Sequence, residues 1–291
     1  MGGATKDDIQ HHYDVGNEFY RLWLDERRVY SSARPSAEHQ RLEDAQLDKL
    51  DYHIDALGLS GRGRVLDVGC GWGALLQRGL ERGVFETPYG LTLSASQEQA
   101  CQQLLGTDAT VALESWEQHR AAPYDGIVSI GSFEHFVRTD DDRRTKVDRY
   151  RAFFSFCAEH LVDGGCLSLQ TIAYGVMPGA RLNRFIADRI FPGSDLPYLS
   201  EIADAAHGLM TIEVVENRPH DYSWTCSSWA DRLIERQAEA IELVGADKTA
   251  EFVKFLKMSA AGFDRGALML YRIRLRKCGG QRRHRQLDIA S

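Results

Sequence analysis

Short apolar runs, separated by glycine-rich turns and helix-like stretches, recur through the middle of the chain. In residues 64–83, RVLDVGCGWGALLQRGLERG, an apolar run gives way to glycines and then to apolar residues at helical spacing. This order predicts a strand, a tight turn and a helix. Strands that alternate with helices favour a parallel sheet covered on both faces. Further apolar runs, each predicted to be a strand, occupy 88–93, 109–113, 124–131 and 164–172.

Both ends of the chain depart from this alternation. The first sixty residues contain two aromatic-rich pieces, IQHHYDVGNEFYRLWLDE and RLEDAQLDKLDYHIDALGL, that we predict to be helices. Towards the other end, strands over 211–217 and 267–275 flank a long amphipathic helical stretch near 228–257. Residues 174–209, between two strands, are predicted to form a helical insertion or lid.

No internal repeat or low-complexity linker divides the chain, so we expect one main domain. It spans 61–277, includes the lid at 174–209, and follows a helical N-terminal cover over 1–60. Residues 278–291 are expected to form a flexible basic tail. This tail either stays solvated or contacts an anionic lipid or diphosphate.

Composition narrows the class of protein. The 291 residues carry 35 Lys and Arg against 42 Asp and Glu, a net charge of −7, and 43% are hydrophobic. A chain of this kind can bury a core, and its acidic body lacks the basic face of a nucleic-acid enzyme. No apolar run reaches the ~18 residues of a membrane span, and the start lacks the apolar core of a signal peptide. We therefore expect a cytoplasmic protein without stable membrane insertion. Its six cysteines include no CxxC pair, so we expect reduced thiols and no metal site.

The string DVGCGWG at 67–73 places three glycines between the end of a strand and the start of a helix. There the backbone passes close to a ligand. The spacing is neither the GxGxxG of dinucleotide sites nor a phosphate-binding loop. Asp67 would repel a phosphate and attract an ammonium group. These features favour a nucleoside that bears an amino acid, namely S-adenosylmethionine.

Eight strings between about residue 12 and residue 275 carry a resemblance to one known family. They are YDVGNEFYRLWLD, VYSSA, VLDVGCGWG, GLTLSASQ, ESWEQH, SIGSFEHF, IFPGSDLP and the PH..Y......W pattern at 219–229. In order and spacing the chain resembles the cyclopropane fatty acid and mycolic acid synthases, which are class I methyltransferases. The resemblance implies an α/β, Rossmann-like, seven-stranded, mostly parallel sheet whose last strand is antiparallel, with N-terminal helices and a helical lid insertion.

The resemblance also implies which residues bind S-adenosylmethionine. They come from five segments, and Ile130 belongs to the one that closes over the methyl group. Trp116 offers a stacking face for adenine, and Glu117 can accept a hydrogen bond from its amine. The expected cofactor residues are Tyr30, Ser31, Asp67, Gly69, Gly71, Thr92, Leu93, Gln97, Trp116, Glu117 and Ile130.

Glu134, after the fourth strand, matches the family's active-site acid, whereas the neighbouring His135 is expected to cap or pack. Cyclopropane synthases hold a bicarbonate-like base with, among others, a Cys and a His. The matching positions here are Ser32 and Gln170, and Gln170 cannot offer an anion a positive charge. Tyr222 is retained. The expected catalytic residues are Glu134, Tyr222, Tyr198, Gln170 and Ser32, with the two tyrosines handling a cation or a proton.

Several functions remain open at this point. The leading hypothesis is methylation of an alkene carbon of a lipophilic substrate, with a prenyl or terpenoid side chain in secondary metabolism favoured, as in the teleocidin-pathway enzyme. The resulting carbocation would then be deprotonated or cyclised. Alternatives are cyclopropanation of an unsaturated fatty acyl chain, O- or N-methylation of a small molecule, and S-adenosylmethionine binding without turnover. The N-terminal segment could also build a homo-oligomer.

Overall fold

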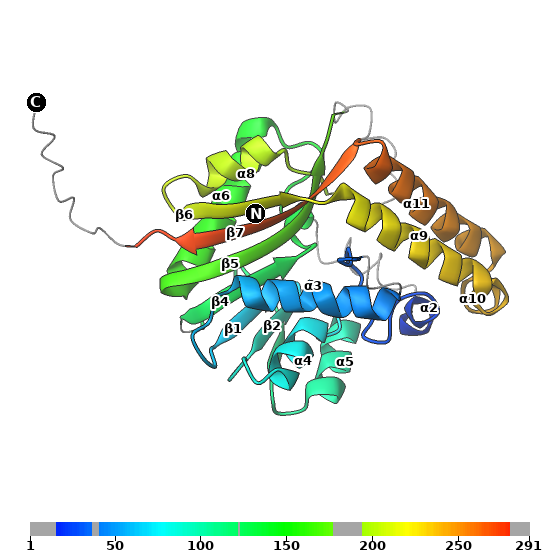
Figure 1. The fold of residues 1–291 in the computed structure, drawn as a ribbon, viewed down its shortest axis with the longest axis horizontal. Helices are drawn as coiled ribbons and strands as arrows, with labels where there is room; N and C mark the ends of the chain where they lie inside the picture. Colours follow the sequence, from blue (N-terminus) through cyan, green and yellow to red (C-terminus); the bar gives the residue numbers. More distant parts are fainter. Residues whose placement is uncertain (1–15, 37–40, 122, 177–193, 280–291) are drawn as a thin grey trace, which may run out of the picture.

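The computed structural model describes residues 16–36, 41–121, 123–176 and 194–279. Within them, one seven-stranded sheet has the order β3-β2-β1-β4-β5-β7-β6 (Figure 1). Strands β1 to β5 are parallel, and β7 is antiparallel to both β5 and β6. This confirms the predicted mostly parallel sheet. Its strands are β1 (Val65–Val68), β2 (Tyr89–Thr92), β3 (Thr110–Leu113), β4 (Tyr124–Ile130), β5 (Leu161–Tyr174), β6 (Met210–Asn217) and β7 (Leu268–Lys277).

Helices cover both faces of this sheet because its central strands are apolar on both sides. On β1, Val65 belongs to a core cluster with Leu50 and Ile54 of the helix α3 (Leu42–Ala56). Its neighbour Leu66 belongs to a second cluster with aromatic residues of α6 (Arg143–His160). Alternate residues of a strand point to opposite faces, so α3 and α6 lie on opposite sides. The helices α4 (Ala74–Glu81) and α5 (Ala95–Leu105) follow β1 and β2 in the chain.

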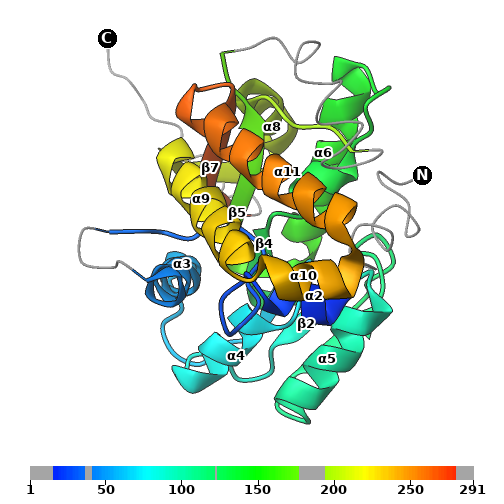
Figure 2. The ribbon, with the colours of Figure 1, turned by 90° about the vertical axis from the view of Figure 1, so that its right-hand side faces the viewer.

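Beyond the carboxyl ends of the parallel strands lies a further group of helices (Figures 1 and 2). It consists of α9 (Pro219–Glu235), α10 (Gln237–Val244), α11 (Ala246–Asp264) and the short α2 (Asn17–Arg21). The single helix predicted near 228–257 is therefore wrong in its extent. Gly245 lies between α10 and α11 with a φ of 84°, a left-handed conformation that interrupts a helix and that glycine adopts readily. At the other end, Pro219 starts α9 nine residues earlier than expected, in a position that suits proline.

The N-terminal prediction is only half confirmed. The second predicted helix is α3, but the described part of the first is helical only over Asn17–Arg21. Of the expected lid at 174–209, residues 177–193 lie outside the described part. Residues 199–206 form the helix α8, which packs against α6. The first fifteen residues and residues 280–291 of the basic tail also lie outside the described part.

Aromatic rings join the N-terminal segment to the C-terminal helices at the carboxyl end of the sheet. Trp229 of α9 has its ring centre 5.7 Å from that of Trp23 and 5.3 Å from that of Tyr30. Phe252 of α11 lies 4.9 Å from Phe19. Such edge and tilted contacts favour a fixed relative position of the two segments. The chain therefore closes over this end of the sheet from both termini.

Candidate active site

A cavity of about 620 Å³ lies at the carboxyl ends of β1, β2 and β4. This volume is typical of small-molecule sites, and the end of a parallel sheet is where such folds place their ligands. The structure brings all of the predicted cofactor residues to this cavity. Its lining includes Tyr30, Ser31, Asp67, Gly69, Gly71, Thr92, Leu93, Gln97, Trp116, Glu117 and Ile130.

The glycine turn after β1 has the geometry that a ligand lying against backbone requires. Gly69 has a φ of 84°, and a Cβ there would lie 2.6 Å from the Cβ of Ser132 in the turn after β4. Gly71 also has a positive φ, 54°, but a Cβ there would meet nothing within 4 Å. Gly69 therefore lets two turns approach each other, while Gly71 leaves open space at the cavity wall.

Polar and aromatic groups also line this cavity. Thr92 Oγ1 donates a hydrogen bond of 2.8 Å to Gln97 Oε1, which fixes both side chains. The indole of Trp116 is held by Phe153 and Phe156 of α6, with ring centres 5.4 and 5.5 Å away. This placement fits the expected contacts with ribose and adenine.

Lys49 is a cavity residue that the sequence did not reveal as functional. It is buried on α3, lines the same cavity and donates a 2.9 Å hydrogen bond to Ser31 Oγ. Burial lowers the pKa of Lys49 to about 7, although the negative charge of Asp25 acts to raise it. Burial also raises the pKa of Asp67 to about 7, although the positive charge of Lys49 acts to lower it. A cationic and an acidic group in one cavity fit the carboxylate and ammonium of an amino acid.

A second cavity, of about 50 Å³, shares part of its wall with the first. Tyr30, Ser31 and Gly131 line both cavities. The predicted catalytic residues Glu134 and Tyr222 line the smaller one. Its remaining lining is mainly apolar and aromatic: Ile172, Leu196, Cys226, Trp229, Phe255, Leu256, Phe263, Leu268 and Leu270, with Gln170, Thr171 and Ser259 as further polar side chains.

Glu134 is positioned by the short 3-10 helix η1 (Phe133–Phe136) that follows β4. One carboxyl oxygen accepts a 2.6 Å hydrogen bond from the Ile172 backbone N–H of β5. The other, Oε2, is buried and has no hydrogen-bond partner among the described residues. Burial raises the pKa of Glu134 from 4.5 to about 7, although the Ile172 hydrogen bond opposes this. Such a carboxyl can gain and lose a proton near neutral pH.

Gln170 and Ser32 differ in where their side chains lie. Gln170 Oε1 accepts a 2.8 Å hydrogen bond from Nε of Arg272, which is wholly buried on the adjacent strand β7. Its amide nitrogen faces the backbone oxygen of Ser32 at 3.5 Å. The Ser32 hydroxyl donates to the Ala33 carbonyl at 3.0 Å, and Ser32 does not line the small cavity. The structure therefore brings Gln170 to this cavity but not Ser32.

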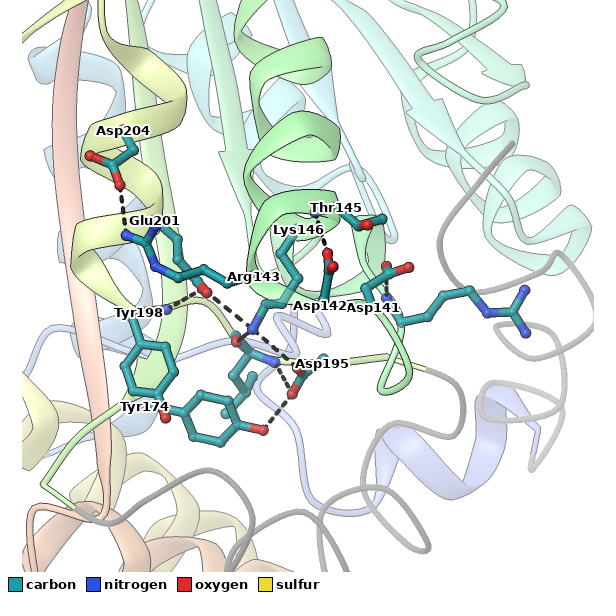
Figure 3. Close-up of polar contacts among 12 residues, drawn as sticks. Asp141, Asp142, Arg143, Thr145, Lys146, Tyr174, Asp195, Tyr198, Glu201 and Asp204 are labelled. Atoms are coloured by element: carbon teal, nitrogen blue, oxygen red, sulfur yellow. Dashed lines mark hydrogen bonds and ion pairs between the residues drawn. The ribbon is translucent and has the colours of Figure 1, made fainter.

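The two predicted catalytic tyrosines also lie in different places. The Tyr222 ring, on α9, stacks on Phe263 with centres 4.6 Å apart at the small cavity. Tyr198 instead precedes α8 and packs on Tyr174, 5.1 Å away (Figure 3). It lines neither of the two cavities. His135, expected to cap or pack, hydrogen bonds Ser194 Oγ at 2.9 Å and also lines the large cavity.

The described residues contain neither a candidate metal cluster nor a helix that could span a membrane. Among them, no group of three or more His, Cys, Asp or Glu is arranged to hold a metal ion. None of the helices found in these ranges is both long and apolar enough to cross a membrane.

The sheet order and the glycine-lined cavity at its carboxyl end define a class I S-adenosylmethionine-dependent methyltransferase. Residues 3–273 match the family model described as mycolic acid cyclopropane synthetase. The chain belongs to this family and is an S-adenosylmethionine-dependent enzyme.

Known relatives agree with this assignment. Cyclopropane mycolic acid synthase 1 of Mycobacterium tuberculosis is 34% identical over 88% of this chain and 92% of its own length. The solved structure of the cyclopropane synthase MmaA2 from the same organism has a TM-score of 0.86 at 32% identity, covering 94% of this chain and 99% of its own. Cyclopropane synthase CmaA1, solved with S-adenosylhomocysteine and CTAB, has a TM-score of 0.85 at 32% identity over 94% of this chain and 99% of its own.

A more distant neighbour bears on the prenyl hypothesis. The geranyl diphosphate C-methyltransferase of Streptomyces coelicolor has a TM-score of 0.65 but only 14% identity, over 96% of this chain and 100% of its own. This likeness shows a common fold only.

Proposed function

We propose that the protein methylates a carbon–carbon double bond of an unsaturated acyl chain and closes the product to a cyclopropane. The observation that carries this proposal is the wall that Tyr30, Ser31 and Gly131 share between the two cavities. A methyl donor in the large cavity would reach an acceptor in the small one across this wall. The mainly apolar lining of the small cavity suits the reacting carbons of a hydrocarbon chain, although its volume of about 50 Å³ holds only a short segment of that chain.

S-Adenosylmethionine supplies an electrophilic methyl group. Transfer of this methyl group to the double bond of the acceptor would form a carbon–carbon bond, break the carbon–sulfur bond and leave a positive charge on the acceptor. The rings of Tyr222, Trp229 and Phe263 line the cavity where this charge develops. Their π faces stabilise a cation, and the apolar lining excludes water that would trap it.

Ring closure requires a base that removes a proton from the added methyl group. A bicarbonate ion fits poorly here, because Gln170, at the position expected to match the family's His, cannot carry a positive charge and has its carbonyl oxygen bound to Arg272. The Ser32 hydroxyl donates to a backbone carbonyl instead. We therefore propose that Glu134 is the base that accepts this proton. Its buried Oε2 has no hydrogen-bond partner among the described residues, and its carboxyl group lines the cavity.

The prenyl hypothesis receives less support than cyclopropanation. Relatives at 34% and 32% identity are named for mycolic acid and cyclopropane synthesis, whereas the geranyl diphosphate enzyme, at 14%, shares only the fold. The described lining of the small cavity also contains no Lys or Arg to bind a diphosphate. Prenyl methylation is the second candidate, and the cytoplasmic location and the homo-oligomer stay predictions.

A deuterium experiment separates these outcomes. The enzyme is incubated with S-adenosylmethionine carrying a trideuterated methyl group and with vesicles of an oleoyl phospholipid, and the acyl chains are analysed by mass spectrometry. Cyclopropanation retains two of the three deuterium atoms, whereas methyl addition with migration retains all three. Label on oxygen or nitrogen, or on geranyl diphosphate in a parallel reaction but not on oleoyl chains, would refute the proposal.

The identity of the base is tested in the same assay. Removing dissolved bicarbonate by degassing, and then restoring it, should leave the rate of the oleoyl reaction unchanged if Glu134 accepts the proton. A rate that rises severalfold when bicarbonate is restored would instead show that bicarbonate is the base.

A further inference from the structure

One wall of the small cavity is carried by residues 194–198, which form neither helix nor strand. The Leu196 side chain in this segment is 1% exposed and lines the cavity together with Glu134 and Ile172. A segment without regular structure needs side-chain contacts to fix its position. The position of Leu196 therefore depends on what binds residues 194–198.

Lys146 of α6 supplies the central contact (Figure 3). Its ammonium donates to the Leu196 carbonyl oxygen at 2.6 Å and to Asp195 Oδ2 at 3.0 Å. Glu201 Oε2, at the start of α8, lies 3.3 Å away. Lys146 is only 4% exposed. Charge-assisted hydrogen bonds of this kind are strong, and a buried charge that loses its partner is costly.

Asp195 holds the other polar group of Leu196. Its Oδ1 accepts a 2.9 Å hydrogen bond from the Leu196 backbone N–H and a further one from the Tyr174 hydroxyl. Burial, with the Asp195 hydrogen bond, raises the pKa of Tyr174, so its hydroxyl remains a donor. Tyr174 also donates its backbone N–H to the Pro197 carbonyl at 2.9 Å. Both backbone polar groups of Leu196 are thus fixed by the buried cluster of Lys146, Asp195 and Tyr174.

We propose that Lys146 is a positioning residue that sets the shape of the acceptor cavity through Leu196 and so selects the apolar acceptor. The inference rests on the proposed function, because it takes the small cavity as the acceptor side. Lys146 does not line either cavity, so its effect has to pass through residues 195 and 196.

The chain provides a matched control one turn away. Arg143 also projects from α6 and binds Asp204 of α8 at 2.7 Å (Figure 3). Both partners are more than half exposed at their side chains, and neither contacts residues 194–198 in the described interactions. Lys146 and Arg143 therefore both join α6 to α8, but only Lys146 holds the cavity wall.

The experiment compares Lys146→Met with Arg143→Met. Calorimetry measures the affinity for S-adenosylhomocysteine, and then the affinity of that complex for cetyltrimethylammonium, an alkyl-chain probe. We expect Lys146→Met to weaken alkyl binding about tenfold, corresponding to one charged hydrogen bond, with the S-adenosylhomocysteine affinity within about twofold. Arg143→Met should change neither affinity.

Leu196→Ala tests the route of the effect. It should weaken alkyl binding to a similar extent, and the double variant Lys146→Met/Leu196→Ala should be no weaker than either single variant. Additive losses, an equal loss in Arg143→Met, or wild-type alkyl affinity in Lys146→Met with only a lower melting temperature would overturn the inference.

Two further features keep the test decisive. If Lys146→Met does not fold, Tyr174→Phe removes only the hydroxyl bound to Asp195 and should weaken alkyl binding about threefold; wild-type affinity in that variant would reject the proposal. Binding also needs no turnover. Absence of methyl transfer to oleoyl chains would therefore refute the proposed function while the binding data still decide the role of Lys146.

Discussion

Glu134 combines burial, one hydrogen-bonded oxygen and one oxygen without a described partner. Because its pKa is raised from 4.5 to about 7, its neutral form is the one that the folded protein favours. This contribution to stability is fully present below pH 4.5 and is lost as the pH rises through about 7. Above pH 7 the carboxylate is available as a base but destabilises the fold.

Glu134→Gln should therefore act in opposite directions on activity and stability. Formation of the cyclopropane on oleoyl chains should fall at least ~100-fold, because the acceptor of the ring-closing proton is gone. At pH 8 the free energy of unfolding should rise by about 2–3 kcal/mol, and this gain should disappear near pH 5. Urea unfolding at both pH values and the initial rate between pH 6 and 9 measure these effects. A wild-type rate that does not rise through pH 7 would argue against Glu134 as the base.

Lys49 allows a second test at the same scale. Lys49→Met should weaken S-adenosylhomocysteine binding about 10- to 100-fold, because one charged hydrogen-bond donor at the amino-acid end is lost. The exposed Lys254 on α11, changed to Met, is the matched control and should bind as the wild type does. Calorimetric titration measures both. Equal affinity in the two variants would show that Lys49 only packs against Ser31.

Single residues were also the hardest to predict from the sequence. The ordered motifs predicted a set of cofactor residues that the structure gathers at one cavity, since a glycine turn and a strand end have fixed places in such a sheet. They missed Lys49, whose only signal is a lysine on the buried face of α3 beside Leu50 and His53. They also could not show that the Ser32 hydroxyl points to a carbonyl or that Tyr198 packs on Tyr174, because side-chain direction depends on tertiary contacts.

At the scale of elements, the turn after β1 is where strand, helix and cavity meet. The seven strands were predictable because their apolar runs are bounded by turn residues. The division of the last helical stretch was not, because an amphipathic pattern continues across Gly245 while its backbone does not. Local conformation at glycine thus decides both where helix α11 begins and how closely the turns after β1 and β4 approach at the cavity.

Gly69→Ala tests this turn. The new Cβ would meet Ser132 at 2.6 Å in a left-handed conformation, so we expect a loss of roughly 3 kcal/mol in stability and of at least ~10-fold in S-adenosylhomocysteine affinity. Gly83→Ala is the control, since its φ of 66° is also positive but its Cβ would meet nothing within 4 Å. It should cost about 1 kcal/mol and leave binding unchanged. Urea unfolding and calorimetry distinguish the two variants.

At the scale of the whole molecule, the two ends of the described chain depend on each other through Trp229. Its indole contacts Trp23 and Tyr30 from the N-terminal segment and Tyr222 within α9, and it lines the small cavity. Removing this ring should loosen both the N-terminal segment and the C-terminal helices, because the aromatic contacts of Trp229 join the two.

Trp229→Ala should accordingly cost about 3–5 kcal/mol in stability. Hydrogen exchange should accelerate both in residues 17–33 and in α9 to α11, whereas β1 to β3, which pack on α3 to α5 instead, should keep their protection. Mass spectrometry of peptides from the exchanged protein measures this pattern. Val214→Ala on the exposed edge strand β6 serves as control and should change neither region. Faster exchange confined to α9 would mean that the N-terminal segment, with Tyr30, is held independently of Trp229.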